Sequence, residues 1–126
     1  MDRGWREAIH EDDFDAEASV QGTHMQVALT GTADLTVKRQ LDYFLHNLHA
    51  QAQKRALGQV SVDVRRLEFM NSSCLKSLAW WVGAVQEQPP DRRYRIVFLS
   101  SPTMYWQRLS LGNLANLAHD IISVER

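Results

Sequence analysis

The chain has 126 residues, of which 44% are hydrophobic and 23% charged, and its formal net charge is −1. This length and composition predict a single globular domain. The sequence contains no run of about 18 apolar residues, so we expect no membrane-spanning helix. The near-zero net charge gives no general attraction for nucleic acid or a membrane surface. The single cysteine, Cys74, excludes an internal disulfide and favours a reducing, cytoplasmic compartment.

Charge is unevenly distributed along the chain. Residues 1–20 hold seven acidic and two basic side chains, whereas the remaining residues hold eight acidic and twelve basic ones. We therefore predict an acidic N-terminal arm over residues 1–16 and a single domain over residues 17–126. Two interpretations of the arm stay open: a solubilising, partly flexible leader, or a segment that docks on the basic body through Trp5 and Phe14.

The first half of the domain shows strand and helix periodicities in turn. Alternating apolar and polar side chains predict strands over residues 17–22 and 24–30, which pair as a hairpin. Apolar side chains at helical spacing then predict a helix that begins near Asp34 and ends at Gly58. Alternation returns over residues 59–64 and predicts a central strand.

The second half begins with a predicted loop over residues 65–70, whose Leu67, Phe69 and Met70 point inward. The remaining predicted elements are a helix over residues 72–88, a strand over 94–99, a helix that begins with Ser101 as cap and Pro102 as first residue and breaks at Gly112, and a strand over 121–124. The order β-β-α-β-α-β-α-β predicts an α/β fold: a mostly parallel mixed sheet with helices packed against it.

Four segments in this order resemble a known family. They are LTGTAD (29–34), VSVDVRRL (60–67), FMNSSCL (69–75) and WQRLSLGNL (106–114). The chain resembles a STAS domain of the bacterial anti-sigma-factor antagonist type over residues 17–126. The third segment resembles the family's Asp-Ser-Ser/Thr-Gly-Leu signature loop in a divergent form. Asn71 stands in place of the Asp, Cys74 in place of the Gly, and Lys76 in place of a further Gly.

The resemblance implies a regulatory role and no catalytic activity. Members of the family bind an ATP-dependent serine kinase, often one that is also the anti-sigma factor, and thereby regulate transcription. The kinase phosphorylates the serine after the signature Asp, and a PP2C-type phosphatase reverses the modification. Carried over to this chain, the phospho-acceptor is Ser72, and Asp34 borders the same surface.

The residues of this turn are compatible with a phosphorylated state. A helix N-terminus presents free N–H groups and the positive end of the helix dipole, which stabilise a phosphate. Lys76 lies one helical turn after Ser72 and can pair with that phosphate. Asn71 also removes the negative charge that an Asp would place beside it. The alternative is that Asn71 or Ser72 only caps the helix. Ser73, which the helical wheel places further outward, is the fallback acceptor.

Two other side chains of the same predicted helix suggest functions. The wheel places Trp80 opposite the apolar stripe and Trp81 on its flank, which predicts Trp80 as an exposed partner anchor. Cover by the N-terminal arm or by a homodimer is the alternative. Cys74 in the first turn suggests a reactive thiol, but no other cysteine and no histidine adjoins it, which favours a small buried residue.

From these observations we predict a protein–protein interaction switch. Its partner-binding residues are Asp34, Asn71, Ser73, Lys76 and Trp80, around the phospho-acceptor Ser72. The expected partners are a serine kinase or anti-sigma factor and a PP2C-type phosphatase. We expect no cofactor and no metal, because the five histidines show no ligand spacing and no glycine-rich phosphate loop is present. One alternative is a scaffold module that is never phosphorylated, and another is a thiol sensor or enzyme that uses Cys74.

Overall fold

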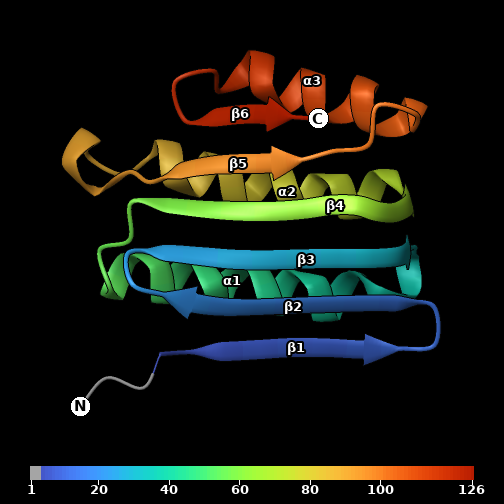
Figure 1. Cartoon of the computed structure of the whole chain (residues 1–126), viewed down its shortest axis with the longest axis horizontal. Helices are drawn as coiled ribbons and strands as arrows, with labels where there is room; N and C mark the ends of the chain where they lie inside the picture. Colours follow the sequence, from blue (N-terminus) through green and yellow to red (C-terminus); the bar gives the residue numbers. More distant parts are fainter. Residues whose placement is uncertain (1–3) are drawn as a thin grey trace.

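The computed structural model describes residues 4–126, which form one six-stranded sheet with three α-helices (Figure 1). The strands are β1 (Arg6–Glu11), β2 (Phe14–Gln21), β3 (His24–Ala33), β4 (Gln59–Met70), β5 (Arg95–Leu99) and β6 (Ile122–Glu125). The helices are α1 (Lys38–Lys54), α2 (Ser72–Gln86) and α3 (Tyr105–Leu117), with short 3-10 helices η1 (Leu35–Val37) and η2 (Pro90–Arg92).

The strands lie in the sheet in their order along the chain. Strands β1, β2 and β3 are antiparallel neighbours, whereas β3, β4, β5 and β6 run parallel. Each parallel pair is joined by one helix, as such connections require a crossover. The predicted α/β class, with a mixed and mostly parallel sheet, is confirmed.

The structure has one strand more than predicted, because β1 precedes the expected hairpin. Within β1 only Ala8 and Ile9 are apolar, so its alternation is too weak to detect in the sequence. Strand β2 begins at Phe14, which is fully buried, and not at residue 17. Residues 1–3 of the predicted acidic arm (1–16) lie outside the described residues, and residues 4–16 contribute β1 and the start of β2 to the sheet. Sheet pairing, rather than docking on a basic surface, holds residues 4–16 in place.

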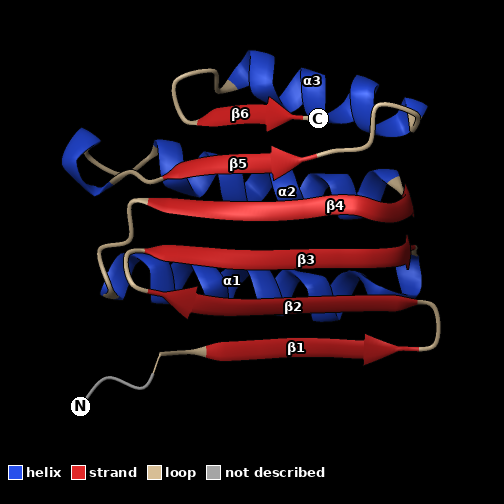
Figure 2. Cartoon of the chain, in the orientation of Figure 1, coloured by secondary structure: helices blue, strands red, loops and turns tan. Residues whose placement is uncertain are grey.

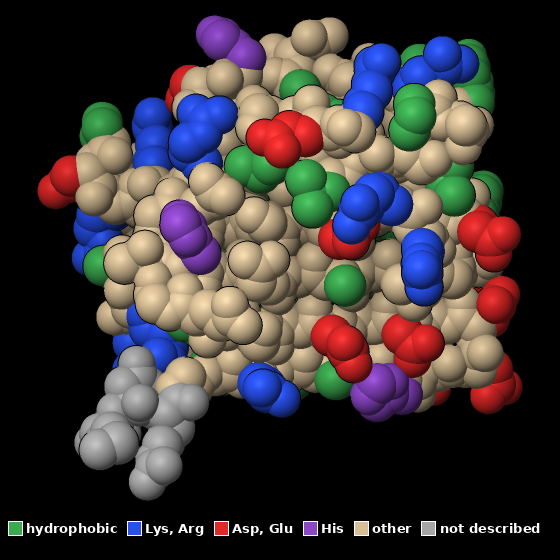
Figure 3. Space-filling view, in the orientation of Figure 1, with side chains coloured by type: hydrophobic (Ala, Val, Ile, Leu, Met, Phe, Trp, Pro, Cys, Tyr) green, Lys and Arg blue, Asp and Glu red, His purple; other side chains and the backbone are tan. Residues whose placement is uncertain are grey.

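All three helices lie behind the sheet in the view of Figure 2. The strands direct alternate side chains toward them, and the core residues from both layers include Met25, Val27, Leu29, Leu41, Leu45, Leu48, Val60, Val62, Leu78, Trp81, Val85, Ile96, Phe98 and Leu111. The opposite face of the sheet is uncovered and mostly polar, as Figure 3 shows. The strands therefore alternate between an apolar and a polar face, which is more typical of antiparallel sheets.

Strand β4 is longer than predicted, because the expected loop over residues 65–70 continues the strand. Leu67 and Met70 are buried as predicted, but Phe69 is 48% exposed, so the prediction for Phe69 was wrong. The pairing of β3 with β4 shifts register twice in this part. These bulges interrupt the simple alternation, which explains why the sequence indicated a loop.

Helix α3 begins at Tyr105 and not at Ser101, and Gly112 lies inside it rather than breaking it. The buried Gln107 accounts for the later start, because its side chain accepts a hydrogen bond from Ser101 N at 2.8 Å. Its amide nitrogen donates to Val64 O and Leu67 O at 2.6 and 3.0 Å, and so anchors the start of α3 on β4.

Candidate functional site

The candidate site lies where the parallel strands β3 and β4 end side by side. Ala33 is paired with Met70 in the register of the two strands, so the following residues, Asp34 and Asn71, begin adjacent turns. The backbone N–H of Asn71 donates to Ala33 O at 2.9 Å and ties the two turns together. We call the surface formed by Asp34, Leu35 and the first turn of α2 the β3–β4 end.

Asn71 is the N-cap of α2. Its side-chain oxygen accepts a hydrogen bond from Cys74 N at 2.9 Å, which satisfies one of the free N–H groups of the first turn. The capping role predicted as an alternative is thus present. It does not compete with modification of Ser72, since the cap uses Asn71 and leaves the Ser72 side chain exposed.

Asp34 caps η1 in the neighbouring turn. Its carboxylate accepts hydrogen bonds from the backbone N–H and the hydroxyl group of Thr36, and these bonds lower the pKa of Asp34. The Cys74 thiol donates to Asp34 O at 3.4 Å, a second link between the two turns. Asp34 is exposed, so the β3–β4 end carries one fixed negative charge.

Ser72 and Ser73 differ in exposure. Ser72 is exposed, and its hydroxyl group makes no hydrogen bond to another residue within 4–126. Ser73 is only half-buried rather than exposed, so the expectation that Ser73 points further outward was wrong. Both serines lie in the first helical turn, and the Ser72 side chain is the more accessible of the two.

Lys76 is exposed one helical turn after Ser72, as the spacing predicted. At the following residue of α2, Ser77 Oγ accepts a hydrogen bond from Lys38 of α1 at 2.8 Å and donates one to Asp42. Lys38 also donates to Asp42 at 3.2 Å. This partly buried network links α2 to α1. The sequence shows Lys38 and Asp42 at helical spacing, but nothing in it brings Ser77 to them.

Cys74 is fully buried under the turn. Burial raises the pKa of its thiol, and the nearby charges of Lys38, which lowers it, and of Asp42 and Asp34, which raise it, have smaller effects. The helix N-terminus was expected to favour the thiolate, but a buried thiol with a raised pKa is a poor nucleophile. The structure thus favours the small buried residue over the thiol sensor.

Trp80 is 41% exposed, and Trp81 is completely buried. The exposed position of Trp80 was predicted. Its indole ring stacks on His46 of α1, with ring centroids 3.8 Å apart and an interplanar angle of 19°, and it meets the edge of His49 at 6.3 Å. Residues of α1, and not residues 4–16 of the N-terminal arm, therefore cover part of the Trp80 ring. Trp80 lies eight residues after Ser72, about 12 Å along the helix.

Exposed apolar side chains lie within the β3–β4 end and next to it, and the sequence did not indicate them. Leu35, Phe69 and Tyr105 are 65%, 48% and 68% exposed. Leu35 follows Asp34, and Phe69 precedes the Asn71 turn by two residues. Tyr105 begins α3, whose Trp106 donates to Leu67 O of β4 at 3.1 Å and so brings α3 to the same end. Exposed large apolar residues that gather in one region indicate an interaction surface.

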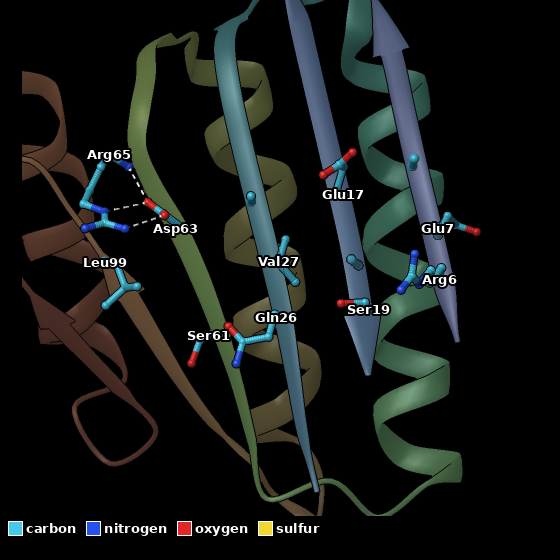
Figure 4. Close-up of a pocket in the computed structure, with 13 residues that line it drawn as sticks. Arg6, Glu7, Glu17, Ser19, Gln26, Val27, Ser61, Asp63, Arg65 and Leu99 are labelled. Carbon is cyan, nitrogen blue, oxygen red and sulfur yellow. Dashed lines mark hydrogen bonds and ion pairs between the residues drawn. The ribbon is translucent and has the colours of Figure 1, made fainter. Parts of the chain in front are cut away.

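A second concave region lies on the uncovered face of the sheet (Figure 4). This hollow of about 700 Å³ is lined by residues that include Arg6, Glu17, Gln26, Ser61, Asp63 and Arg65. Arg65 pairs with Asp63 at 2.8 Å, and this hydrogen bond is the main cause of the lowered pKa of Asp63. Within residues 4–126 no group of three or more His, Cys, Asp or Glu side chains is placed to hold a metal ion.

The same fold occurs in a solved structure, an anti-sigma factor antagonist from Mycobacterium paratuberculosis. The two chains are 14% identical, with a TM-score of 0.66, and the match covers 92% of this chain and 88% of the other. No family model and no curated protein matches the chain. At this identity the similarity shows the fold, and the predicted STAS-type fold is thereby confirmed. None of the helices within residues 4–126 has the length and apolar character needed to span a membrane.

Proposed function

We propose that the protein is a cytoplasmic regulatory binding protein of the anti-sigma-factor antagonist type, and that Ser72 is its phosphorylation switch. In its unmodified form, the β3–β4 end docks a serine kinase that also acts as an anti-sigma factor. Phosphorylation of Ser72 weakens this docking, and a PP2C-type phosphatase restores it. The protein itself catalyses nothing in this scheme and uses no cofactor.

The observation that carries the proposal is the exposed Ser72 hydroxyl group beside exposed apolar side chains. Leu35, Phe69 and Tyr105 provide a surface that a partner can desolvate. A phosphate adds about two negative charges at pH 7, and it would stand beside the charge of Asp34. Repulsion and the cost of desolvating the phosphate then oppose docking.

The modified form is expected to stay folded. The free N–H groups at the start of α2 and the nearby Lys76 stabilise a phosphate on Ser72. Ser72 is exposed, and its hydroxyl group makes no hydrogen bond to another residue within 4–126. Phosphorylation of Ser72 therefore breaks no contact of the core. The switch therefore acts on binding and not on folding.

The direct test is intact-mass measurement after incubation with ATP and a serine kinase that binds this protein. We expect one added phosphate, mapped to Ser72 by peptide analysis and absent from the Ser72→Ala variant. Ser73→Ala is the matched control and retains the modification. A phosphate on Ser73 would overturn the site assignment. No phosphate from an active kinase that binds the protein would favour the constitutive scaffold, in which Asn71 serves only as a cap.

A further inference from the structure

The strand β1 forms an unpaired border of the sheet at the end opposite β6 (Figure 1). It pairs with β2 on one side only, so alternate backbone N–H and C=O groups point away from the sheet. Such an edge can accept one more strand from another chain.

A hollow of about 350 Å³ lies between β1 and α1, beside this edge. Its lining includes Glu7, Ile9 and Glu11 from β1 and the exposed Tyr43 from α1. Because strand side chains alternate, Glu7, Ile9 and Glu11 share the face toward α1. Figure 4 shows the Glu7 side chain directed away from the larger hollow on the opposite face.

Both carboxylates are held by side chains of α1, and the carboxylate of Glu7 is incompletely satisfied. Asn47 donates to Glu7 Oε1 at 2.8 Å, and Gln40 donates to Glu11 Oε1 at 2.6 Å. The other oxygen of Glu7, Oε2, is buried and makes no hydrogen bond to any residue within 4–126. A buried carboxylate oxygen without a donor is costly, and a cation placed in the hollow would relieve that cost.

The surrounding charge points to the same occupant. The β1–β2 turn adds the exposed Asp12 and Asp13, and acidic side chains are visible at this end of the sheet in Figure 3. A second copy of this chain fits poorly, because two β1 strands paired about Ile9 would place Glu7 opposite Glu11. A pairing about Ala8 would instead place Arg6 opposite His10.

We propose that the β1 edge binds an extended cationic segment of a partner protein by strand addition. On the side facing α1, the segment carries a cation, an apolar residue and a second cation at every other position. The cations pair with Glu7 and Glu11, and the apolar side chain packs on Ile9 and Tyr43. The order cation, apolar residue, cation is the same from either end of the segment, so the segment can add to β1 as a parallel or as an antiparallel strand. The proposal is independent of Ser72 and of the β3–β4 end.

The test uses the full chain and the probe peptide Thr-Lys-Thr-Val-Thr-Lys-Thr with blocked ends. We expect chemical-shift changes concentrated on the β1 backbone amides. The Glu7→Gln variant should weaken binding about tenfold, because it removes a charged hydrogen-bond partner. Glu125→Gln on β6, at the opposite edge, should leave the affinity unchanged, and so should Ser72→Asp, which separates this site from the switch.

Two peptide modifications decide between strand addition and simple charge attraction. N-methylation of the even positions blocks one edge of the peptide, and N-methylation of positions 3 and 5 blocks the other. Strand addition predicts that only one of these two peptides loses binding. A shuffled peptide with adjacent lysines should also bind weakly. The proposal is overturned if both methylated peptides bind, if the shuffled peptide binds equally well, or if the probe does not bind at millimolar concentration.

Discussion

Gly31 on β3 lies so close to the carbonyl group of Asp13 that a Cβ atom at residue 31 would overlap it. The close approach arises because Thr32 N donates to Asp13 O at 2.7 Å, which fastens the β1–β2 turn onto β3. Gly31 also has φ +93°, in the left-handed region that favours glycine. Both features place the acidic turn firmly in the sheet.

This contact predicts that Gly31→Ala is strongly destabilising. Backbone strain and the steric overlap together should cost about 2–5 kcal/mol in the free energy of unfolding. Gly22→Ala is the control: Gly22 has φ +63° but no atom within 4 Å of an added Cβ. It should show only the backbone cost, about 1–2 kcal/mol. Equal losses in urea unfolding would mean that the overlap with Asp13 is relieved by a small shift.

Gln107 is expected to be essential for the position of α3. Gln107→Leu preserves the approximate volume but removes the side-chain donor to Val64 O and the acceptor for Ser101 N. Leu67 O loses one donor and keeps the hydrogen bond from Trp106. The expected loss is about 2–4 kcal/mol, measured by chemical denaturation. Gln86→Leu is the matched control, because Gln86 makes one exposed hydrogen bond of 3.3 Å to Leu117 O. If Gln86→Leu also lowered the free energy of unfolding by more than about 1 kcal/mol, the loss in Gln107→Leu would reflect a general effect of placing Leu in a helix and not the lost hydrogen bonds.

The two adjacent tryptophans should respond in opposite ways. Trp81→Ala removes a fully buried ring and the donor to Tyr94 OH, and it should cost about 3–5 kcal/mol of stability. Trp80→Ala loses the stacking on His46 and the edge contact with His49, and it should cost about 0.5–1.5 kcal/mol of stability. Partner binding should weaken in the Trp80 variant if α2 forms part of the docking surface. Thermal melts and a binding assay together separate the two effects.

Stability should fall as the pH decreases below about 6.5, the ordinary pKa of histidine. Burial, with a smaller effect from His46, lowers the pKa of His49 in the folded state. The unfolded chain therefore binds this proton more readily, so stability is full above pH 6.5 and is lost as the pH falls through the lowered folded-state pKa. His49→Gln should flatten this slope in urea melts between pH 7 and 5. The exposed His24→Gln should not.

The Cys74 thiol should be protected in the folded protein. Its burial and raised pKa predict slow alkylation by iodoacetamide under native conditions and rapid alkylation in urea. The Cys74→Ser variant has no thiol and gives the background signal of the alkylation assay. Native alkylation as fast as that of a free cysteine would restore the thiol-sensor hypothesis.

Local patterns in the sequence determined most of the fold. Helices α1 and α2 and strands β3 and β5 follow from apolar periodicity and from breakers such as Pro89, because these signals depend on neighbours within a few residues. The turn at Asn71 and Ser72 was found in the same way, since a capping residue before a helix is a local feature.

Contacts between distant parts of the chain decided the rest. Strand β1 has too few apolar residues to be recognised alone, and only its pairing with β2 and its contact with α1 make it a strand. The start of α3 depends on Gln107 reaching β4, some 40 residues earlier in the chain. The exposure of Leu35, Phe69 and Tyr105 at one end likewise follows from how β3, β4 and α3 meet, because side chains far apart in sequence become one surface only through packing.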